Sequence, residues 1–326
     1  MRAVASVVIA LLAASSLAGA GPGTHAVPGT PPVSASDVVE EPLYLEAGTD
    51  AARAESRLRA AGDTAAADAI GRIASQPTAV WLGEWWGEPL MRSVIRRHVA
   101  AAARQGATLV FVTYAIPFRD CGGHSAGGTD YAEYLDWNRV VAAELAGTGA
   151  MVLVEPDSLA SLANPKCASE VDVRPGLIGQ AVDILEAAGL RTYLDGGNSN
   201  WLTPAAQAEW LGRAGIARAT GFYTNVSNFY PVQRESDYAG KVSSRVGWKH
   251  YVIDVSRNGR GWTGTWCNPA GAGLGQDPRS VPGSTKLDAL LWVKHPGASD
   301  GPCNGGPAAG AWWEEYALAL VANRPS

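Results

Sequence analysis

Met151-Val-Leu-Val-Glu-Pro-Asp157 decides the fold class, because a short apolar run ends directly in carboxylates beside a proline. Five runs of this form occur, each followed by an aspartate. They are 108–117 before Asp120, 151–155 before Asp157, 191–194 before Asp195, 250–253 before Asp254, and 287–294 before Asp300. Such runs are typical of central strands of a parallel sheet, whose ligands gather outside the carboxyl ends of the strands. We therefore expect the five aspartates to share one rim.

Crowded carboxylates indicate acid/base chemistry. Like charges that lie close together cannot all ionise freely, so the pKa values within such a group are pushed apart. One carboxyl then keeps its proton near neutral pH while a neighbour stays charged, which provides a proton donor and a charged carboxylate in one site. The rim of the predicted sheet is therefore the candidate active site.

Strand and helix patterns alternate along the chain. Segments 78–82 and 221–224 raise the number of expected strands to seven, and helical patterns are found at 51–73, 89–104, 131–145, 176–188, 204–214, 236–246 and 311–322. This alternation predicts an α/β protein with a parallel sheet and right-handed crossovers, either open or closed into a barrel. One large domain is expected, because α/β barrels often reach this length as a single unit.

The N-terminus has the form of a secretion signal. Arg2 precedes an apolar run at 3–17 and the small residues Ala18-Gly19-Ala20. We expect residues 1–20 to be a signal peptide, residues 21–40, rich in Pro, Gly, Ser and Thr, to be a flexible leader, and residues 41–326 to be the catalytic domain. No later run reaches about 18 consecutive apolar residues, so a secreted protein without a membrane span is predicted.

Composition restricts the partners. The net charge is -5 and no basic run occurs, which disfavours nucleic acid and anionic lipid and favours a neutral substrate. Twelve Trp residues favour sugar binding, because sugar rings stack on flat aromatic faces, although a buried core Trp is more common. No Cys-x-x-Cys occurs, so zinc is not expected, and no cofactor is predicted. A hard-cation site among the acids is a further alternative, but no EF-hand-like loop supports it.

Four cysteines in an exported chain imply disulfides, and three pairings are possible. Pairing Cys121 with Cys167 and Cys267 with Cys303 would join the loops that carry the acids. Each bridge would add roughly 3 to 4 kcal/mol by the loop-entropy model.

Each candidate acid also has a structural interpretation. Asp120 would pair with the neighbouring Arg119, Asp157 would cap the turn at 159–163, and Asp300 would form a surface salt bridge with Lys294. The loop Leu194-Asp-Gly-Gly-Asn-Ser-Asn-Trp201 combines an acid, amides and a Trp with a Gly pair that allows close approach to a ligand.

Taken together, the motifs resemble those of the glycoside hydrolase family 6 cellulases, from about Leu43 to Asn323. The matching blocks are Arg119-Asp-Cys-Gly122, Glu155-Pro-Asp157, Asp195-Gly-Gly-Asn-Ser-Asn-Trp201, Thr224-Asn-Val-Ser-Asn228, Ile253-Asp-Val-Ser-Arg-Asn-Gly259, Trp266-Cys267 and Lys294-His-Pro-Gly297 through Asp300-Gly301. The two cysteine pairs named above also coincide with that family's disulfides.

The resemblance implies a distorted seven-stranded parallel β/α barrel that hydrolyses β-1,4-glucosidic bonds with inversion. The resemblance matches Asp157 to the general acid and Asp120 to the carboxylate that keeps this acid protonated and organises the water. Asp300 matches the candidate base, which acts directly or through a water relay, and Asp195 matches a supporting acid. The substrate-binding residues that it implies are Tyr114, the tyrosine under the distorted sugar, the stacking platforms Trp81, Trp201 and Trp266, and the polar groups Asn228 and Lys294. An inverting pair needs roughly 6.5 to 9.5 Å between carboxyl groups, which acids on separate strands can provide.

Two positions depart from the family's pattern. Asn198 stands where the family usually has His, and Ala298 where it usually has Glu. A glucan-binding protein that has lost activity is therefore an alternative. Segments 268–285 and 302–309 are short compared with the loops that cover the cleft of cellobiohydrolases. An open cleft is therefore expected, with endo attack on a β-glucan by a monomeric enzyme. Cellobiohydrolase action is the other alternative.

Overall fold

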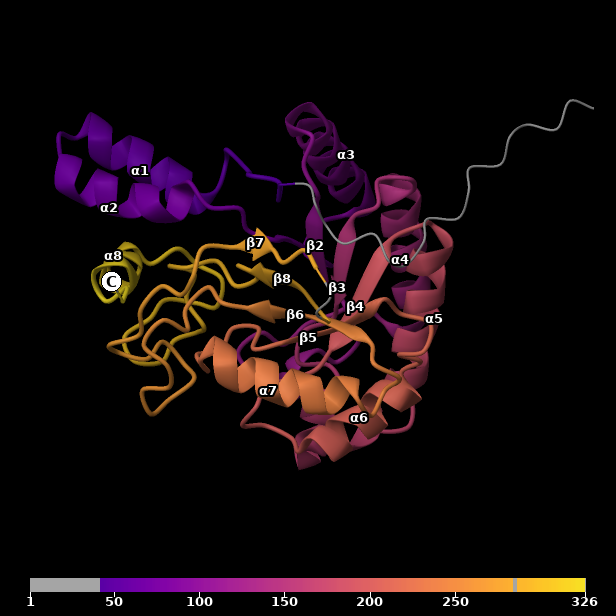
Figure 1. Ribbon diagram of the computed structural model, residues 1–326. Coiled ribbons are helices and arrows are strands. Elements are labelled where there is room, and N and C mark those ends of the chain that lie inside the picture. The colour runs from indigo at the N-terminus through magenta and orange to yellow at the C-terminus, as the bar shows by residue number, and fades with distance from the viewer. Residues whose placement is uncertain (1–41, 284–285, 326) are drawn as a thin grey trace, which may run out of the picture. The chain divides into compact units, whose positions relative to one another are not determined.

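Seven parallel strands form the centre of the protein (Figure 1). The computed structural model describes residues 42–283 and 286–325, so the expected signal peptide and leader at 1–20 and 21–40 lie outside the described residues. The sheet order is β1-β2-β3-β4-β5-β6-β8-β7. The strands are β1 Val80–Gly83, β2 Val110–Tyr114, β3 Met151–Val154, β4 Arg191–Asp195, β5 Gly221–Thr224, β6 His250–Asp254, β7 Arg279–Ser280 and β8 Leu287–Leu291.

The predicted α/β class and parallel sheet are confirmed, with one addition. The eighth strand, β7, pairs antiparallel with β8 and is only two residues long, too short to leave a pattern in the sequence. The sheet curls into a half-barrel, and a backbone hydrogen bond of 3.0 Å from Ala79 N–H to the Trp292 carbonyl joins the region before β1 to the region after β8.

Both faces of the sheet are buried, which explains why its strands lack a polar alternation. Successive side chains of a strand point to opposite faces. In β2, Val110 and Val112 pack inside the curl, whereas Phe111 packs outward against the helices. In β3, Met151 and Leu153 likewise face inward.

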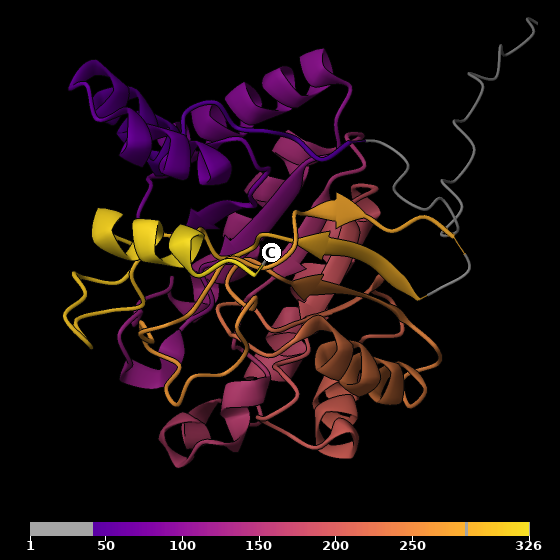
Figure 2. The same cartoon turned by 60° about the vertical axis from the view of Figure 1, so that its left-hand side comes forward.

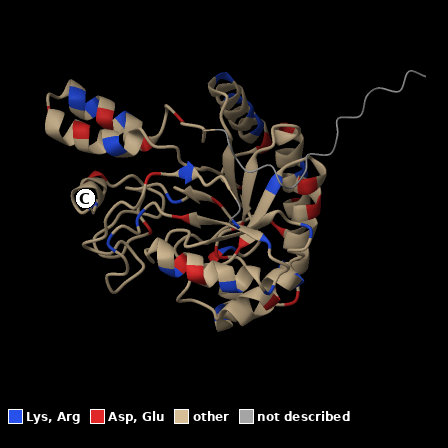
Figure 3. Ribbon diagram, in the orientation of Figure 1, with Lys and Arg blue, Asp and Glu red and all other residues tan. Residues whose placement is uncertain are grey.

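Helices follow most of the strands and cover the outside of the sheet (Figures 1 and 2). They are α3 Glu88–Gln105, α4 Tyr131–Leu145, α5 Arg174–Ala187, α6 Pro204–Arg213, α7 Val232–Ser243 and α8 Glu314–Ala322. α7 begins four residues before its predicted start, because Pro231 serves as its N-cap and the polar first turn carries little apolar signal. Acidic and basic residues are mixed along the helices (Figure 3).

The single helix predicted at 51–73 is wrong. The structure has two helices there, α1 Asp50–Ala60 and α2 Thr64–Ala74. Gly62 adopts φ +83°, which ends α1, and the Asp63 side chain accepts a hydrogen bond from Ala66 N–H as the N-cap of α2. The alanine-rich composition masked this turn.

Two disulfides join loops at the carboxyl ends of the strands. Cys121 is bonded to Cys167, which ties the loop after β2 to the loop after β3. Cys267 is bonded to Cys303, which ties the loop after β6 to the loop after β8. This is the pairing expected from the sequence. Among the described residues, none of the helices combines the length and hydropathy that a membrane span requires.

Candidate active site

Carboxylates at the ends of two strands anchor the loops of neighbouring strands. Glu155, directly after β3, accepts hydrogen bonds from the backbone N–H groups of Ala115 and Ile116, directly after β2, at 2.9 and 3.0 Å. Asp254, the last residue of β6, accepts one from Ser227 N–H in the loop after β5 at 3.2 Å. Both acids are buried. They fix where the loops leave the sheet.

Asp195, at the end of β4, anchors the loop that carries Asp157. Its Oδ2 accepts hydrogen bonds from the N–H groups of Leu159 and Ala160, each at 3.0 Å. Burial raises the pKa of Asp195, and the backbone N–H donors oppose that shift. Asp157 therefore lies between two anchored points, with Glu155 two residues before it and Leu159 two residues after it.

Asp157 has the properties of a proton donor. Burial raises its pKa well above the usual value, and the negative charges of Asp195, Asp120 and Asp300 raise it further, while Lys294 opposes them. These charges act on Asp157 from the end of β4, from the loop after β2 and from the loop after β8, so the structure brings these predicted acids together. The backbone of Asp157 is at φ 67°, a region that non-glycine residues seldom occupy and that often marks a functional residue.

The predicted N-cap role of Asp157 does not describe its side chain. The contact with the following turn is made by the Asp157 backbone carbonyl, which accepts from Ser161 N–H at 3.1 Å. Part of the Asp157 residue stays accessible to solvent.

Asp120 belongs to a short hydroxyl relay. Its Oδ2 accepts hydrogen bonds from Ser125 N–H at 2.9 Å and from the Ser125 hydroxyl at 3.0 Å. The Tyr114 hydroxyl in turn donates to Ser125 Oγ at 3.0 Å. Burial raises the pKa of Tyr114, so this phenol keeps its proton. The relay links Asp120, in the loop after β2, to Tyr114, the last residue of β2.

The predicted pairing of Asp120 with Arg119 is wrong. Arg119 instead pairs with Glu84, in the loop after β1, with Nη1 to Oε2 at 2.5 Å and Nη2 to Oε1 at 3.0 Å. Its guanidinium also lies 4.3 Å from the centre of the Tyr114 ring. Arg119 therefore pairs with a distant residue rather than with its sequence neighbour, and it joins the loop after β2 to the loop after β1.

Asp300 forms the predicted salt bridge with Lys294, but the pair is buried, so its predicted place on the surface is wrong. Asp300 Oδ2 lies 2.9 Å from Arg257 Nη1, and Oδ1 lies 3.2 Å from Lys294 Nζ. Burial alone would raise the pKa of Asp300, but Arg257 and Lys294 outweigh it and lower the pKa. Burial lowers the pKa of Lys294, and Asp300 opposes that shift. Asp300 is therefore a firmly ionised carboxylate.

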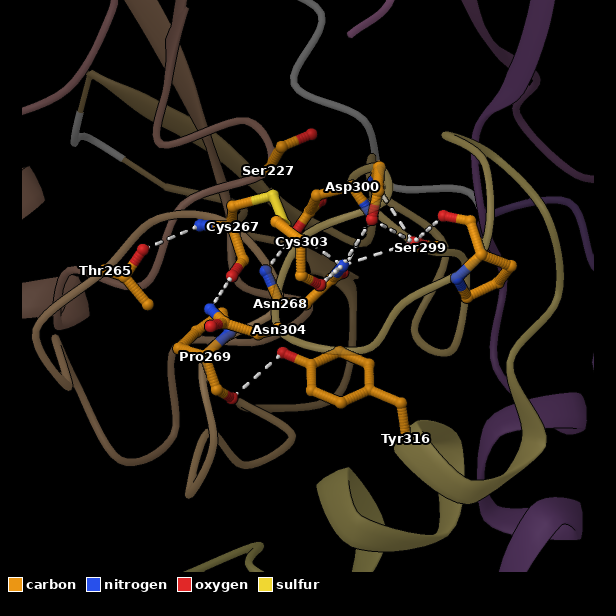
Figure 4. Close-up of a disulfide and its surroundings, with 12 residues drawn as sticks. Ser227, Thr265, Cys267, Asn268, Pro269, Ser299, Asp300, Cys303, Asn304 and Tyr316 are labelled. Atoms are coloured by element: carbon orange, nitrogen blue, oxygen red, sulfur yellow. Dashed lines mark hydrogen bonds between the residues drawn. A yellow bond between two sulfur atoms is a disulfide. The ribbon is translucent and has the colours of Figure 1, made fainter.

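Asn268, next to the Cys267–Cys303 disulfide, holds Asp300 in place (Figure 4). Its backbone N–H donates to Asp300 Oδ2 at 2.9 Å, and its Oδ1 accepts from Asp300 N–H at 2.8 Å. Its Nδ2 donates to the carbonyl oxygens of Gly301 and Cys303 at 2.9 and 3.1 Å. One buried amide thus joins the loop after β6 to the loop after β8.

Replacing Asn268 with Ala is expected to lower the free energy of unfolding by about 2 to 3 kcal/mol, because it leaves the buried N–H of Asp300 without its acceptor and removes the hydrogen bonds that Asn268 Nδ2 donates to two carbonyl groups. Asn268 also has φ 44°, which Asn tolerates better than Ala. Urea unfolding of the variant measures the change. A difference below about 0.5 kcal/mol would contradict the role of this amide.

Aromatic side chains surround the acids. Trp81 meets the Tyr114 ring edge-on, with centroids 5.0 Å apart, and its Nε1 donates to the Val293 carbonyl at 2.8 Å. Trp201 and Trp266 are 39% and 51% exposed, which leaves ring surface for a ligand. The His124 ring lies beside Trp266, so the loop after β2 reaches the loop after β6.

Three predicted positions have local backbone contacts. The Asn228 side chain donates to the Val226 carbonyl at 3.5 Å, a weak contact. Asn198, where the resemblance led us to expect His, is buried and accepts a hydrogen bond from Asn200 N–H through Oδ1 at 3.0 Å. Ala298, where the resemblance led us to expect Glu, donates a hydrogen bond from its backbone N–H to the His295 carbonyl.

Sequence reasoning assigned no role to several residues that organise the site. Ser125 links Asp120 to Tyr114, Arg257 neutralises Asp300, and Glu84 binds Arg119. The signal for Arg257 was present in the motif 253–259, which was quoted without a role for it. Glu84 carried no signal because its partner lies 35 positions away in the sequence. Within 42–283 and 286–325, no group of three metal-ligating side chains could hold a metal ion.

Comparison with known proteins agrees with this geometry. The model of the glycosyl hydrolases family 6 matches residues 38–324. The chain belongs to this family. Endoglucanase A of Cellulomonas fimi is 42% identical over 252 residues, which make up 77% of this chain and 55% of that protein. Endoglucanase 1 of Streptomyces halstedii is 34% identical over 304 residues, 89% of this chain and 92% of the relative.

A solved family 6 structure has the same fold. The endoglucanase Cel6 from Mycobacterium tuberculosis, in complex with methyl-cellobiosyl-4-deoxy-4-thio-β-D-cellobioside, superposes with a TM-score of 0.81 at 36% identity. The likeness covers 88% of this chain and 99% of that structure. The half-barrel described above is therefore a family 6 fold.

Proposed function

We propose that this family 6 glycoside hydrolase is an endo-β-1,4-glucanase that cleaves internal bonds of cellulose or related β-glucans with inversion. The observation that carries the proposal is the raised pKa of Asp157 within a group of carboxylates, one of which, Asp300, has a lowered pKa. A protonated donor and an ionised acid from different loops are what an inverting hydrolysis requires. The endoglucanase relatives support the choice of substrate.

In this mechanism Asp157 donates its proton to the departing glycosidic oxygen. The donor must hold a proton near the working pH, and burial together with the charges of Asp195 and Asp120 provides that. Tyr114, beneath the cleaved sugar, contributes a protonated hydroxyl whose own hydrogen bond goes to Ser125. Asp195 supports the donor through the backbone at Leu159.

The water attacks the anomeric carbon from the face opposite Asp157. In this proposal Asp120, which accepts a hydrogen bond from the Ser125 hydroxyl, orients this water. The attacking water gives up a proton as it bonds to the anomeric carbon. Both oxygens of the ionised Asp300 are already engaged by Arg257, Lys294 and Asn268, so in this proposal Asp300 receives that proton through a second water rather than by direct abstraction. In this proposal Lys294 also binds a substrate hydroxyl.

Endo action by a secreted monomer completes the proposal. The exposed rings of Trp201 and Trp266 suit a glucan chain lying across the rim, with Trp81 and Asn228 as further contacts. Two disulfides are typical of exported proteins, which supports residues 1–20 as a signal peptide, 21–40 as a leader and 41–326 as the catalytic domain.

A second candidate is a glucan-binding protein without turnover, which the substitutions at Asn198 and Ala298 favour. NMR analysis of products from defined cello-oligosaccharides separates the two candidates. Release of α-configured products from internal bonds supports the endoglucanase. Binding without any product supports the second candidate, β-configured products contradict inversion, and release of cellobiose from chain ends alone indicates a cellobiohydrolase.

Replacing Asp120 with Asn is expected to shift the basic limb of the pH profile of kcat to lower pH. The charge of Asp120 raises the pKa of Asp157, so its removal lowers that pKa. A general acid works only below its pKa, and activity is then lost at a lower pH than in the parent. The profile is measured on a soluble glucan, with the exposed Asp237→Asn on α7 as the control. An unmoved basic limb in Asp120→Asn contradicts the electrostatic role.

A further inference from the structure

An exposed aromatic ring lies outside the group of residues assigned above. Trp262 is 41% exposed and belongs to the loop after β6, the same loop that carries Trp266. Its ring stacks on Tyr230, with centroids 5.4 Å apart and an interplanar angle of 8°. Tyr230 covers one face of Trp262, so the exposed area belongs to the opposite face and the ring edge.

Tyr230 is a rigid support for this ring. Tyr230 is only 3% exposed, and the guanidinium of Arg234 lies 4.6 Å from the centre of its ring. Because Trp262 covers one face of Tyr230, Arg234 lies over the other. Gly261 and Gly264, at φ +74° and +107°, allow the backbone turns on either side of Trp262. The ring is thus held by a stack rather than presented on a bare loop.

The stack is continuous with the loop of Trp201. Arg234 Nη2 donates to Asn200 Oδ1 at 3.0 Å and to the Ser199 carbonyl at 3.3 Å. Asn200 directly precedes Trp201, which is 39% exposed. The row Trp201, Asn200, Arg234, Tyr230, Trp262 therefore joins loops after β4, β5 and β6, which share the rim of the acids.

We propose that the outer face of Trp262 is a stacking platform for a glucose ring of a β-1,4-glucan chain that continues beyond Trp201. The inference rests on the proposed function, since it extends the same binding surface. An exposed, rigidly supported Trp offers a flat apolar face for the C–H side of a pyranose. The exposed Arg234 and Asn200 lie beside it with donors and acceptors that suit sugar hydroxyls.

The platform predicts a binding effect that depends on chain length. In a protein made inactive by Asp157→Asn, Trp262→Ala is expected to weaken cellohexaose binding by about tenfold and to leave cellotriose binding unchanged, because a short ligand fills the central sites first. Trp262→Phe retains a stacking ring and is expected to weaken cellohexaose binding by about threefold or less. Isothermal titration calorimetry measures each dissociation constant.

Trp248→Ala is the matched control. Trp248 is 61% exposed but precedes β6, at the opposite end of the strand from the acids, and its loss is expected to change neither constant. If Trp262→Ala leaves the dissociation constant of cellohexaose unchanged, or weakens cellotriose binding by the same factor, the platform is contradicted while the proposed function stands. If the inactive parent binds neither oligosaccharide, the proposed function fails and the platform fails with it.

Discussion

Replacement of Asp157 by Ala is expected to lower kcat on a soluble β-1,4-glucan by about 10³-fold or more, because the leaving alkoxide then departs without a proton. The raised pKa of Asp157 and its position between the anchors of Glu155 and Asp195 motivate this expectation. Because those anchors do not involve the Asp157 side chain, the variant is expected to stay folded. Reducing-sugar release and a thermal unfolding curve measure the two effects.

The leaving group provides a control for the Asp157 prediction. A dinitrophenyl cello-oligosaccharide releases a weakly basic phenolate that needs little protonation, so both Asp157→Ala and Asp157→Asn are expected to lose far less activity on it than on glucan. Asn also suits the positive φ of this position better than Ala. Equal losses on the two substrates, or a fully active Asp157→Ala protein, would falsify the assignment of Asp157 as general acid.

Replacement of Arg257 by Met is expected to lower the free energy of unfolding by about 3 kcal/mol, because Asp300 then keeps its charge in a buried place with only Lys294 as a cation. The loss of Arg257 also raises the pKa of Asp300. A group that must be ionised loses function as pH falls through its pKa. The acidic limb of the activity profile is therefore expected to move to higher pH.

Two further variants test whether the loss of stability in Arg257→Met arises from breaking the Arg257–Asp300 ion pair. In the double variant Arg257→Met with Asp300→Asn, the loss of stability is expected to be smaller than the sum of the single losses, since no buried carboxylate is left unpaired. Arg324→Met breaks a more exposed pair with Asp277 and is expected to cost under about 1 kcal/mol. Additive losses in the Asp300 pair would contradict the coupling.

The sequence predicted the sheet well because its strands are buried on both faces. Runs such as 151–154 are apolar throughout, which distinguishes them from their surroundings, and the acids lie at or just after the strand ends as expected. The turn between α1 and α2 was missed because alanine forms helix on both sides of it. The two-residue β7 depends on its pairing with β8, and such a short segment has no periodicity.

The roles of the acids were less predictable than their positions. Asp195 and Asp254 lie at strand ends much as Asp157 does, yet their carboxylates accept hydrogen bonds from backbone N–H groups of neighbouring loops. Which carboxylate faces a backbone and which faces a ligand depends on contacts between distant segments. The pairing of Arg119 with Glu84 rather than Asp120 has the same origin. Local spacing does not contain that information.

The strand-end anchors also bear on how this surface can vary. Glu155, Asp195 and Asp254 hold the first residues of adjoining loops, close to the sheet. Insertions or deletions at the tips of these loops would therefore leave Asp157, with an anchor two residues away on either side, where it is. In such a scaffold the catalytic acid can stay unchanged while the loop tips that contact the polymer vary. One half-barrel can therefore be adapted to glucans of different shape by changes in its outermost segments.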